Sequence, residues 1–279
     1  MPGDPLVTVY LPTRNRLTLV AEAIDSVLDQ TLTNFELIVV DDGSVDGTPE
    51  LLRSKAMTDP RIRILRNEVS LGAPAARNAA IEIARGKFVI GLDDDDLMLP
   101  RRLERLVAAW TGQHSLVCSA FWRRRGPNRR KLNGRSRIIT LDDLLHRNLV
   151  GNQALMLTEQ VRAVGGFDAG FVASQDYDLW VRMVERFGSA LRIGACDHVV
   201  REASEGSRIS QSAAFNTGAV QFTEKHRSLM TASHLRSQRL LHKITARELV
   251  GFKDLPQCFA WGSARLYFKY WAKCALVGP

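Results

Sequence analysis

The first hundred residues alternate two patterns of hydrophobic positions. Short apolar runs rich in Val and Ile predict buried β-strands, and apolar residues that recur every three or four positions predict helices between them. The predicted strands are 7–11, 36–40, 61–65 and 87–92. The first predicted helix carries Val20, Ile24, Val27 and Leu28 on one face, and two further helices are predicted at 47–56 and 73–84. This alternation predicts a mostly parallel sheet that is covered by helices on both faces.

The pattern changes after a predicted helix at 100–110. Two β-rich runs, 115–122 and 136–140, flank a basic stretch and predict an antiparallel hairpin. A short helix at 141–147 follows, and a later helix carries Leu179, Met183, Val184 and Phe187 at helical spacing. From residue 210 to 279 the pattern is mainly helical, with Pro256 as the expected break.

Polar clusters follow three of the predicted strands directly. They are "PTRNR" at 12–16, "DDGSVDGT" at 41–48 and "DDDD" at 93–96. Because the carboxyl ends of parallel strands meet at one edge of a sheet, and ligands bind there, the three clusters are expected to share one site.

Four consecutive carboxylates, Asp93 to Asp96, repel one another unless a cation offsets their charge. Carboxylate oxygens placed after a buried strand are ligands of the kind that Mg²⁺ and Mn²⁺ prefer, and such an ion would also neutralise a diphosphate. The alternative is a solvated acidic turn that caps the next helix, which would account for Asp96.

The other clusters carry groups that suit a nucleotide, each beside a structural alternative. Asp41 and Asp42 at a strand end could accept hydrogen bonds from a base or a ribose, whereas Asp46 and Thr48 suit helix capping. Thr13 and Arg14 offer a hydroxyl and a cation after the first strand. Arg77 either lies on the surface near a helix start, or pairs with Asp93 or a phosphate.

The net charge of +8 is unevenly distributed. Residues 201–279 hold twelve Lys and Arg against five Asp and Glu, and 123–137 hold eight Lys and Arg. Nucleic-acid binding is disfavoured because only Trp122 borders the second cluster. Two explanations of the cluster at 123–137 remain: it is a hairpin exposed to solvent, or it binds an anionic partner such as a lipid headgroup.

Other features of the composition are informative mainly by exclusion. The four cysteines have no paired spacing, which argues against a zinc site and against a disulfide framework and suits a reducing cytoplasm. We expect no secretion signal and, because no apolar run approaches about 20 residues, no membrane-spanning helix.

The motifs in chain order are "PTRNR", "FELIVVDDGSVDGT", "GAPAARNAAIEIARGKFVIGLDDDDLMLPRRLE", "GGFD" and "SQDYDLWVRM". Over residues 5–190 this spaced set resembles family 2 glycosyltransferases, the inverting enzymes of the GT-A fold. The resemblance implies an α/β fold with a Rossmann-like, mixed but mostly parallel sheet flanked by helices. We expect a catalytic domain at 1–209, with a nucleotide-binding half at 1–112 and an acceptor-side half at 113–209, before a mainly helical extension at 210–279.

The resemblance also assigns roles to individual residues. It places donor binding on residues of the three clusters and the third helix, metal binding on the aspartate run and the catalytic base on Asp176. The base would take the proton from the acceptor hydroxyl, with Asp178 as the rival and helix capping as the alternative. The donor-binding set is Pro12, Thr13, Arg14, Asp41, Asp42, Arg77, Asp93 and Asp94, and the metal ligands are Asp95 and Asp93.

One departure from the family pattern concerns a histidine that follows the base in many relatives. The matching region reads "VVREASEGSRIS" and lacks it, and His198 stands several residues early. Arg201 or Arg208 could supply the positive contact to the diphosphate instead.

The sequence therefore predicts a metal-dependent glycosyltransferase that uses Mn²⁺ or Mg²⁺ to move a sugar from a nucleotide-diphosphate donor, a UDP-sugar, to an acceptor hydroxyl. The resemblance suggests a glycan or lipid-linked acceptor in surface-polysaccharide assembly. The alternatives are a nucleotidyltransferase and a nucleotide-sugar binding or scaffold protein without turnover. A cytoplasmic location is expected.

The last helical stretch, "ARLYFKYWAKCAL", bears on membrane association. Arg265, Lys269 and Lys273 recur every four residues beside aromatic side chains, which suits the inner face of the cell membrane. Packing of this helix on the protein itself is the alternative.

Overall fold

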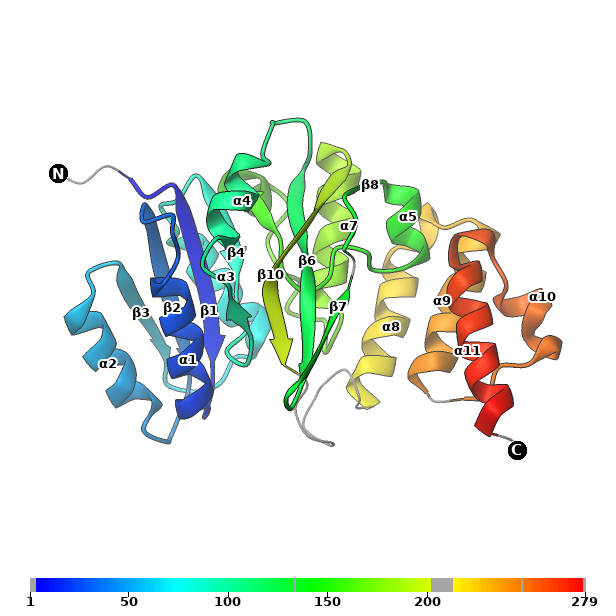
Figure 1. Cartoon of the computed structure of the whole chain (residues 1–279), viewed down its shortest axis with the longest axis horizontal. Coiled ribbons are helices and arrows are strands. Elements are labelled where there is room, and N and C mark those ends of the chain that lie inside the picture. Colours follow the sequence, from blue (N-terminus) through cyan, green and yellow to red (C-terminus); the bar gives the residue numbers. More distant parts are fainter. Residues whose placement is uncertain (1–3, 133, 202–212, 247, 278–279) are drawn as a thin grey trace.

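The computed structural model describes residues 4–132, 134–201, 213–246 and 248–277. Within them, ten strands form one mixed sheet, and the C-terminal helices lie beyond one end of it (Figure 1). The predicted fold class is therefore confirmed.

The N-terminal half of the sheet is parallel. Its strands run in the order β3-β2-β1-β4, and each neighbouring pair is parallel. Thr13 at the end of β1 is in register with Asp41 near the end of β2. The polar residues that follow these strands therefore meet at one edge. The bounds are β1 Val7–Thr13, β2 Phe35–Asp42, β3 Ile62–Asn67 and β4 Phe88–Gly91.

The second half of the sheet continues in the order β9-β6-β10-β5. β9 is antiparallel to both β4 and β6, β10 is parallel to β6, and β5 is antiparallel to β10. The sequence patterns had not indicated β9 or β10. The bounds are β5 Leu97–Met98, β6 Leu116–Arg125, β7 Asn128–Leu132, β8 Arg137–Ile139, β9 Leu155–Leu157 and β10 Ala190–Arg201.

The predicted hairpin between 115–122 and 136–140 is wrong. β6 instead pairs with β7, and β8 pairs with β10. The chain turns at Gly126, whose φ of 55° favours glycine. Six of the eight basic residues are thus part of the β6–β7 hairpin itself, whereas Arg135 and Arg137 follow it, Arg137 in β8.

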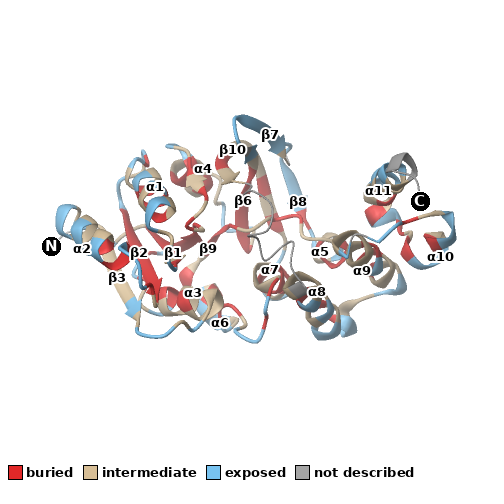
Figure 2. Ribbon diagram, turned by 90° about the horizontal axis from the view of Figure 1, so that it is seen from below, coloured by how far each residue is buried: buried red, intermediate tan, exposed pale blue. Residues whose placement is uncertain are grey.

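Helices cover both faces of the sheet (Figure 2). α1, α2 and α4 pack on one face, and α3, α6 and α7 pack on the other. Alternate residues of β1 serve the two cores: Val9 and Leu11 pack with α1, whereas Tyr10 packs toward α3 and α7. The bounds are α1 Leu17–Leu28, α2 Thr48–Thr58, α3 Ala73–Glu82, α4 Arg102–Ala108, α5 Leu141–His146, α6 Thr158–Ala163 and α7 Gln175–Phe187.

The C-terminal region is helical, as predicted, and has a small core of its own around Leu240, Val250, Cys258 and Tyr267. α8 packs on α7 through a stacked pair of rings, Tyr177 and Phe222, whose centroids are 3.8 Å apart. The bounds are α8 Ala213–Lys225, η2 Arg227–Leu229, α9 Ala232–Thr245, η3 Phe252–Asp254, α10 Leu255–Cys258, η4 Trp261–Ser263 and α11 Ala264–Val277.

Two predictions about this region are refined by the structure. Pro256 lies in the first turn of α10 and starts that helix, whereas the preceding long helix has already ended at Thr245. The expected boundary between residues 209 and 210 lies outside the described residues. No helix among the described residues is long and apolar enough to cross a bilayer.

Candidate active site

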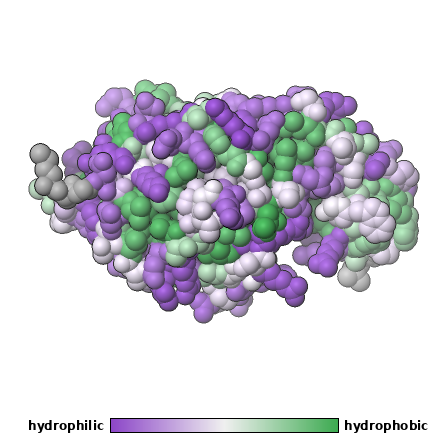
Figure 3. Space-filling view, turned by 90° about the horizontal axis from the view of Figure 1, so that it is seen from above, coloured by the Kyte–Doolittle hydropathy of each residue, from purple (hydrophilic) through white to green (hydrophobic). Residues whose placement is uncertain are grey.

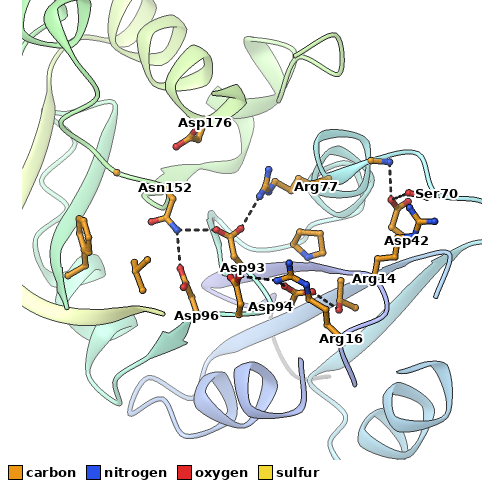
Figure 4. A pocket seen from close by; sticks show the side chains of 18 of the residues that line it. Arg14, Arg16, Asp42, Ser70, Arg77, Asp93, Asp94, Asp96, Asn152 and Asp176 are labelled. Carbon is orange, nitrogen blue, oxygen red and sulfur yellow. Dashed lines mark hydrogen bonds and ion pairs between the residues drawn. The ribbon is translucent and has the colours of Figure 1, made fainter. Parts of the chain in front are cut away.

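A cavity of about 730 Å³ opens at the carboxyl ends of the parallel strands. All three predicted polar clusters contribute to its wall: Pro12, Thr13 and Arg14 after β1, Asp42 at the end of β2, and Asp93 to Asp96 after β4. The acceptor-side half adds Asp176 from α7. Figure 4 shows Arg77 and Asp93 between Asp176 and Asp42 in that view. Residues more than 160 positions apart thus share one site.

The two aspartates of β2 have different surroundings because successive side chains of a strand point to opposite faces. Asp41 does not line the cavity: its carboxylate pairs with Arg66 at 2.6 Å and accepts a hydrogen bond from the Ser44 amide. The structure thus does not bring Asp41 to the donor site, contrary to the prediction, and gives it a role in holding the turn after β2.

Asp42 lies in the cavity wall and anchors the loop that leads into α3. Its carboxylate accepts hydrogen bonds from the side chains of Asn67 and Ser70 and from the amides of Leu71 and Gly72, at 2.6–2.9 Å. Burial raises the pKa of Asp42, but these four donors outweigh burial and lower it. Four donors match the four lone-pair sites of a carboxylate, so Asp42 shapes this wall before it meets any ligand.

Two arginines and a hydroxyl hold Asp93, Asp94 and Asp95, which follow β4. Arg77 donates to Asp93 at 2.9 Å, and Arg16 donates to Asp94 and Asp95 at 3.0 and 2.9 Å. The Thr13 hydroxyl donates to Asp94 at 2.8 Å, which links the ends of β1 and β4.

The charge of this cluster is only partly compensated. Burial raises the pKa of Asp94 to about 6, although Arg16 and Thr13 act in the opposite direction. Burial and the neighbouring carboxylates of Asp96 and Asp93 also raise the pKa of Asp95. Burial would raise that of Asp93 too, but Arg77 outweighs it and the pKa is lowered. A further positive group at Asp94 and Asp95 would therefore stabilise their ionised forms.

Asp96 does not cap α4, contrary to the alternative considered for it, because α4 begins only at Arg102. Its carboxylate accepts from the Asn152 amide at 3.0 Å, lies 3.1 Å from His198 Nε2 and accepts from the backbone of Arg201. Burial holds the pKa of His198 well below its usual value, so the ring is neutral. Asp96 thus ties β4 to β10.

The positive contact expected from Arg201 or Arg208 does not come from a described side chain of this segment. The Arg201 guanidinium forms an ion pair with Glu22, and Arg201 does not line the cavity. Arg208 lies outside the described residues. The cations that do line the cavity are Arg14, Arg16, Arg77 and Arg123.

Asp176 is in the first turn of α7 and lines the cavity. The chain enters this helix through Ser174 in a left-handed conformation, with φ 62°, which directs the following carboxylate inward. Burial raises the pKa of Asp176 to about 6, against the lowering effects of the Tyr177 amide and Arg77. A carboxylate with a pKa near neutrality is a suitable general base at physiological pH.

The rival candidate for the base, Asp178, lies away from the cavity. Its side chain is fully buried, and it pairs with Arg182 at 2.7 Å, with Lys225 at 2.8 Å and with His226 at 2.9 Å. Burial raises its pKa, but these partners outweigh burial and lower the pKa to about 2. Asp178 does not line the cavity and instead joins α7 to α8.

Four cavity-wall or supporting residues had not been predicted: Arg16, Asn148, Asn152 and His198. Arg16 stands within the quoted "PTRNR" motif, so a signal for it existed. Asn148 and Asn152 lie in the segment between α5 and β9, which has no distinctive spacing in the sequence. Asn152 bridges Asp93 and Asp96 at 3.0 Å each, and Asn148 lies 3.4 Å from the Asp176 carboxylate.

The donor set fits a hard divalent cation. Asp93 and Asp95 present carboxylate oxygens to one cavity, and the pKa of Asp95 is raised first by burial and then by the neighbouring carboxylates of Asp96 and Asp93. Arg77 also lines this cavity, and its buried Nη1 has no hydrogen-bond partner among the described residues. Both features suit an anionic ligand accompanied by a metal ion.

Comparison with known proteins identifies the class. The sequence model described as "Glycosyl transferase family 2" matches residues 8–177. WcaA of Escherichia coli K12, named as a glycosyl transferase of colanic acid biosynthesis, is 30% identical over 267 residues, or 86% of this chain and 91% of WcaA. WfgD of Escherichia coli, named as a UDP-Glc:α-D-GlcNAc-diphosphoundecaprenol β-1,3-glucosyltransferase, is 31% identical over 65% of this chain and 71% of its own.

A solved structure agrees with the fold. The mannosyltransferase PcManGT of Pyrobaculum calidifontis, determined with GDP-Man and Mn²⁺, superposes with a TM-score of 0.56 at 22% identity, over all of this chain and 77% of its own. The fold is that of the GT-A type transferases, as the sequence predicted. The chain belongs to glycosyl transferase family 2.

Proposed function

We propose that this glycosyltransferase moves a sugar from a nucleotide-diphosphate sugar, a UDP-sugar, onto an acceptor hydroxyl with inversion at the anomeric carbon, and that it requires Mn²⁺ or Mg²⁺. The observation that carries the proposal is the pairing, in one cavity, of a carboxylate with a pKa of about 6 and an acidic cluster with adjacent cations. Asp176 comes from α7 and the acidic cluster from the segment after β4, and both line the same cavity.

The donor would occupy the side of the cavity formed by β1, β2 and β4. Thr13 and Arg14 would contact the nucleoside beside the wall that Asp42 shapes. Arg77, through its unpartnered Nη1, and Arg16 would bind the diphosphate.

The metal ion would lie on Asp95 and Asp93. When bound, such an ion neutralises the charge that develops on the departing diphosphate. Arg16 forms ion pairs with Asp94 and Asp95 in this structure. We therefore infer that Arg16 exchanges its carboxylate partners for phosphate oxygens when donor and metal bind.

Asp176 would take the proton from the acceptor hydroxyl. At pH 7.5 a carboxyl group with a pKa of about 6 is mostly ionised, yet it is a stronger base than an ordinary aspartate. Asn148 is placed to donate to one Asp176 oxygen and so to fix the orientation of the carboxylate. Trp180 holds this loop by donating from Nε1 to the Gly151 carbonyl at 2.8 Å.

The acceptor that the surface chemistry favours is a lipid-linked glycan, the class named for the relative WfgD. Arg123 lines the cavity, and the exposed side chains of Arg124, Arg129 and Arg130 continue from it along β6 and β7. An acceptor that carries a diphosphate would find complementary charge along this hairpin.

Contact with a membrane surface is part of this proposal. The residues proposed to make it are not those that the sequence predicted in the last helix. Tyr267 is buried, and Leu266, Tyr270 and Trp271 pack against the C-terminal core, so most of the aromatic belt predicted for α11 stabilises the protein itself. Trp261 and Phe252 are exposed by 87% and 65%. Hydrophobic and hydrophilic residues lie side by side over this region, at the right of Figure 3.

Acceptor-dependent release of UDP tests the transfer reaction. UDP-sugars are first screened for thermal stabilisation of the protein with and without Mn²⁺, and the stabilising donor is then incubated with lipid-diphosphate glycans. Release of UDP with glycosylated product supports the proposal. Release of pyrophosphate would indicate a nucleotidyltransferase, and metal-dependent binding without turnover would indicate a binding protein.

Liposome flotation tests the membrane contact separately. Trp261→Ala and Phe252→Ala are compared with the wild type on vesicles containing anionic lipid. Because the two rings protrude from the surface, we expect reduced binding with unchanged thermal stability. Equal flotation of all three proteins would remove the membrane contact from the proposal.

A further inference from the structure

A second group of potential metal ligands lies outside the cavity, where the catalytic part of the chain meets the C-terminal helices. Asp142 and His146 lie on α5, and His234 lies on α9. One ligand atom of each lies within 4.8 Å of the other two. The two imidazole rings meet edge to face with centroids 4.4 Å apart. Both histidines are buried, whereas the Asp142 side chain is 75% exposed, so the group is open to solvent on one side.

Hydrogen bonds fix the tautomer of His146. Its Nδ1 lies 2.8 Å from the Ser237 hydroxyl, which itself donates to the Ser263 hydroxyl, also at 2.8 Å. Ser263 donates to the Ala260 carbonyl at 3.4 Å and so is placed to accept from Ser237. In this arrangement Ser237 accepts from His146, and Nδ1 carries the ring proton. Nε2 therefore keeps its lone pair, as a metal ligand must, and Ser237 supplies the outer-sphere partner that commonly orients such a ring.

The ring of His146 is also held in place by the close packing of Gly262 on its face. A Cβ at Gly262 would lie only 2.3–2.5 Å from Cδ2, Nε2 and Cγ of this ring. Nearly equal distances to three ring atoms place the Gly262 backbone over the ring face, and not in the ring plane in front of Nε2. Gly262 thus allows η4 to pack on the face of the imidazole.

His234 already interacts with the carboxylate of the group. Its Nε2 lies 2.9 Å from Asp142, and its Nδ1 accepts from the Thr231 amide at 3.1 Å. Binding of a metal ion at Nε2 requires the ring proton to move to Nδ1, where the Thr231 hydroxyl at 3.2 Å can accept it. The Thr231 amide then loses its partner, a cost that water offsets because Thr231 is exposed.

We propose that His146 Nε2, His234 Nε2 and the Asp142 carboxylate bind one Zn²⁺ ion. Two imidazoles and one carboxylate are a typical zinc donor set, and the open side leaves room for water as the fourth ligand. Zn–N distances of about 2.0–2.1 Å require ligand atoms about 3.3 Å apart in tetrahedral geometry. His234 Nε2 and the Asp142 carboxylate are already 2.9 Å apart. The ligand atoms of the three residues lie within 4.8 Å of one another, so the farthest pair must approach by up to about 1.5 Å through side-chain rotation.

The zinc ion would fasten α5 to α9. His146 is the last residue of α5, two positions before Asn148, so this link also anchors the start of the loop that contacts Asp176. The inference is independent of the proposed sugar transfer, because none of the three ligands lines the cavity.

Titration of the full chain with Co²⁺ and Zn²⁺, after removal of metals by a chelator, tests the site. Excess Mg²⁺ is present to occupy the acidic cavity. We expect one equivalent of Co²⁺ to give the intense visible absorption of tetrahedral cobalt, and Zn²⁺ to displace it and raise the melting temperature.

The variant Asp142→Asn removes a ligand from an exposed position and so leaves the fold intact. We expect it to weaken zinc binding by more than about 100-fold, beyond the effect of losing an outer-sphere partner. His234→Gln should do the same, whereas Asp95→Ala in the acidic cavity should leave the tetrahedral signal unchanged. Absence of the tetrahedral signal in the wild type, or equal zinc affinity in the wild type and Asp142→Asn, would overturn the proposal.

Discussion

Replacement of Asp176 by Asn should stabilise the protein while it abolishes transfer. The pKa of Asp176 is raised from 3.8 to about 6, so the folded protein bears a cost for ionising this carboxyl. At 1.36 kcal/mol for each pKa unit, the cost above pH 7 is up to about 3 kcal/mol. The side-chain amide of Asn does not ionise, so the variant avoids this cost. Loss of the general base should lower kcat by about 100- to 10,000-fold, whereas donor binding is kept.

The effect on stability has a defined pH dependence. Between pH 3.8 and about 6 the folded state binds more protons at Asp176 than the unfolded state does, so this carboxyl lowers stability progressively as pH rises through that window. The advantage of Asp176→Asn should therefore be complete at pH 8 and should shrink toward zero as pH falls to about 4. Urea unfolding at a series of pH values measures it directly.

Asp178→Asn is the matched control, two positions along the same helix. Burial raises its pKa, but His226, Lys225 and Arg182 outweigh burial and lower the pKa from 3.8 to about 2, so the ionised carboxylate stabilises the fold at neutral pH. Replacement should cost at least about 2 kcal/mol at pH 8. If both variants lost stability equally, or if Asp176→Asn kept the wild-type rate, the assignment of Asp176 as a strained general base would be refuted.

Three further predictions concern the cavity. Asp95→Ala should weaken donor binding in the presence of Mn²⁺ but not in its absence, as measured by calorimetry; equal loss under both conditions would contradict a metal-ligand role. Asn152→Ala, which frees Asp93 and Asp96 from their shared amide, should raise the Mn²⁺ concentration needed for half-maximal rate by about 10- to 100-fold. For the wild type, kcat/KM should fall about tenfold for each pH unit below about 6, because protonated Asp176 cannot accept a proton.

The parallel half of the sheet could be predicted from the sequence because its signals are local. Buried parallel strands are continuous apolar runs in the sequence. The polar residues that follow them lie together because the carboxyl ends of parallel strands meet at one edge of the sheet. Thr13, Asp42 and Asp93 therefore meet as expected. Side chains alternate between the two faces along β2, so the adjacent Asp41 and Asp42 point in different directions. Asp42 lies in the cavity wall, whereas Asp41 pairs with Arg66.

The second half could not be predicted in the same way because its strands pair over long separations. β10 places His198 against Asp96, 102 positions earlier, and no local pattern encodes that contact. β9 has only three residues, too few for a recognisable period. Asn152 is likewise positioned by the path of the segment between α5 and β9. The hydrogen bonds that orient the acidic cluster are thus a product of tertiary structure.

The proposed inverting mechanism predicts the stereochemistry of the product. Attack by an acceptor hydroxyl that Asp176 deprotonates, on the face opposite the diphosphate, inverts the anomeric carbon in a single step. Proton NMR of the product formed from an α-linked UDP-sugar measures the configuration of the new bond. A β-linked product is the predicted result, and an α-linked product would contradict the assignment of Asp176 as the base in a single displacement.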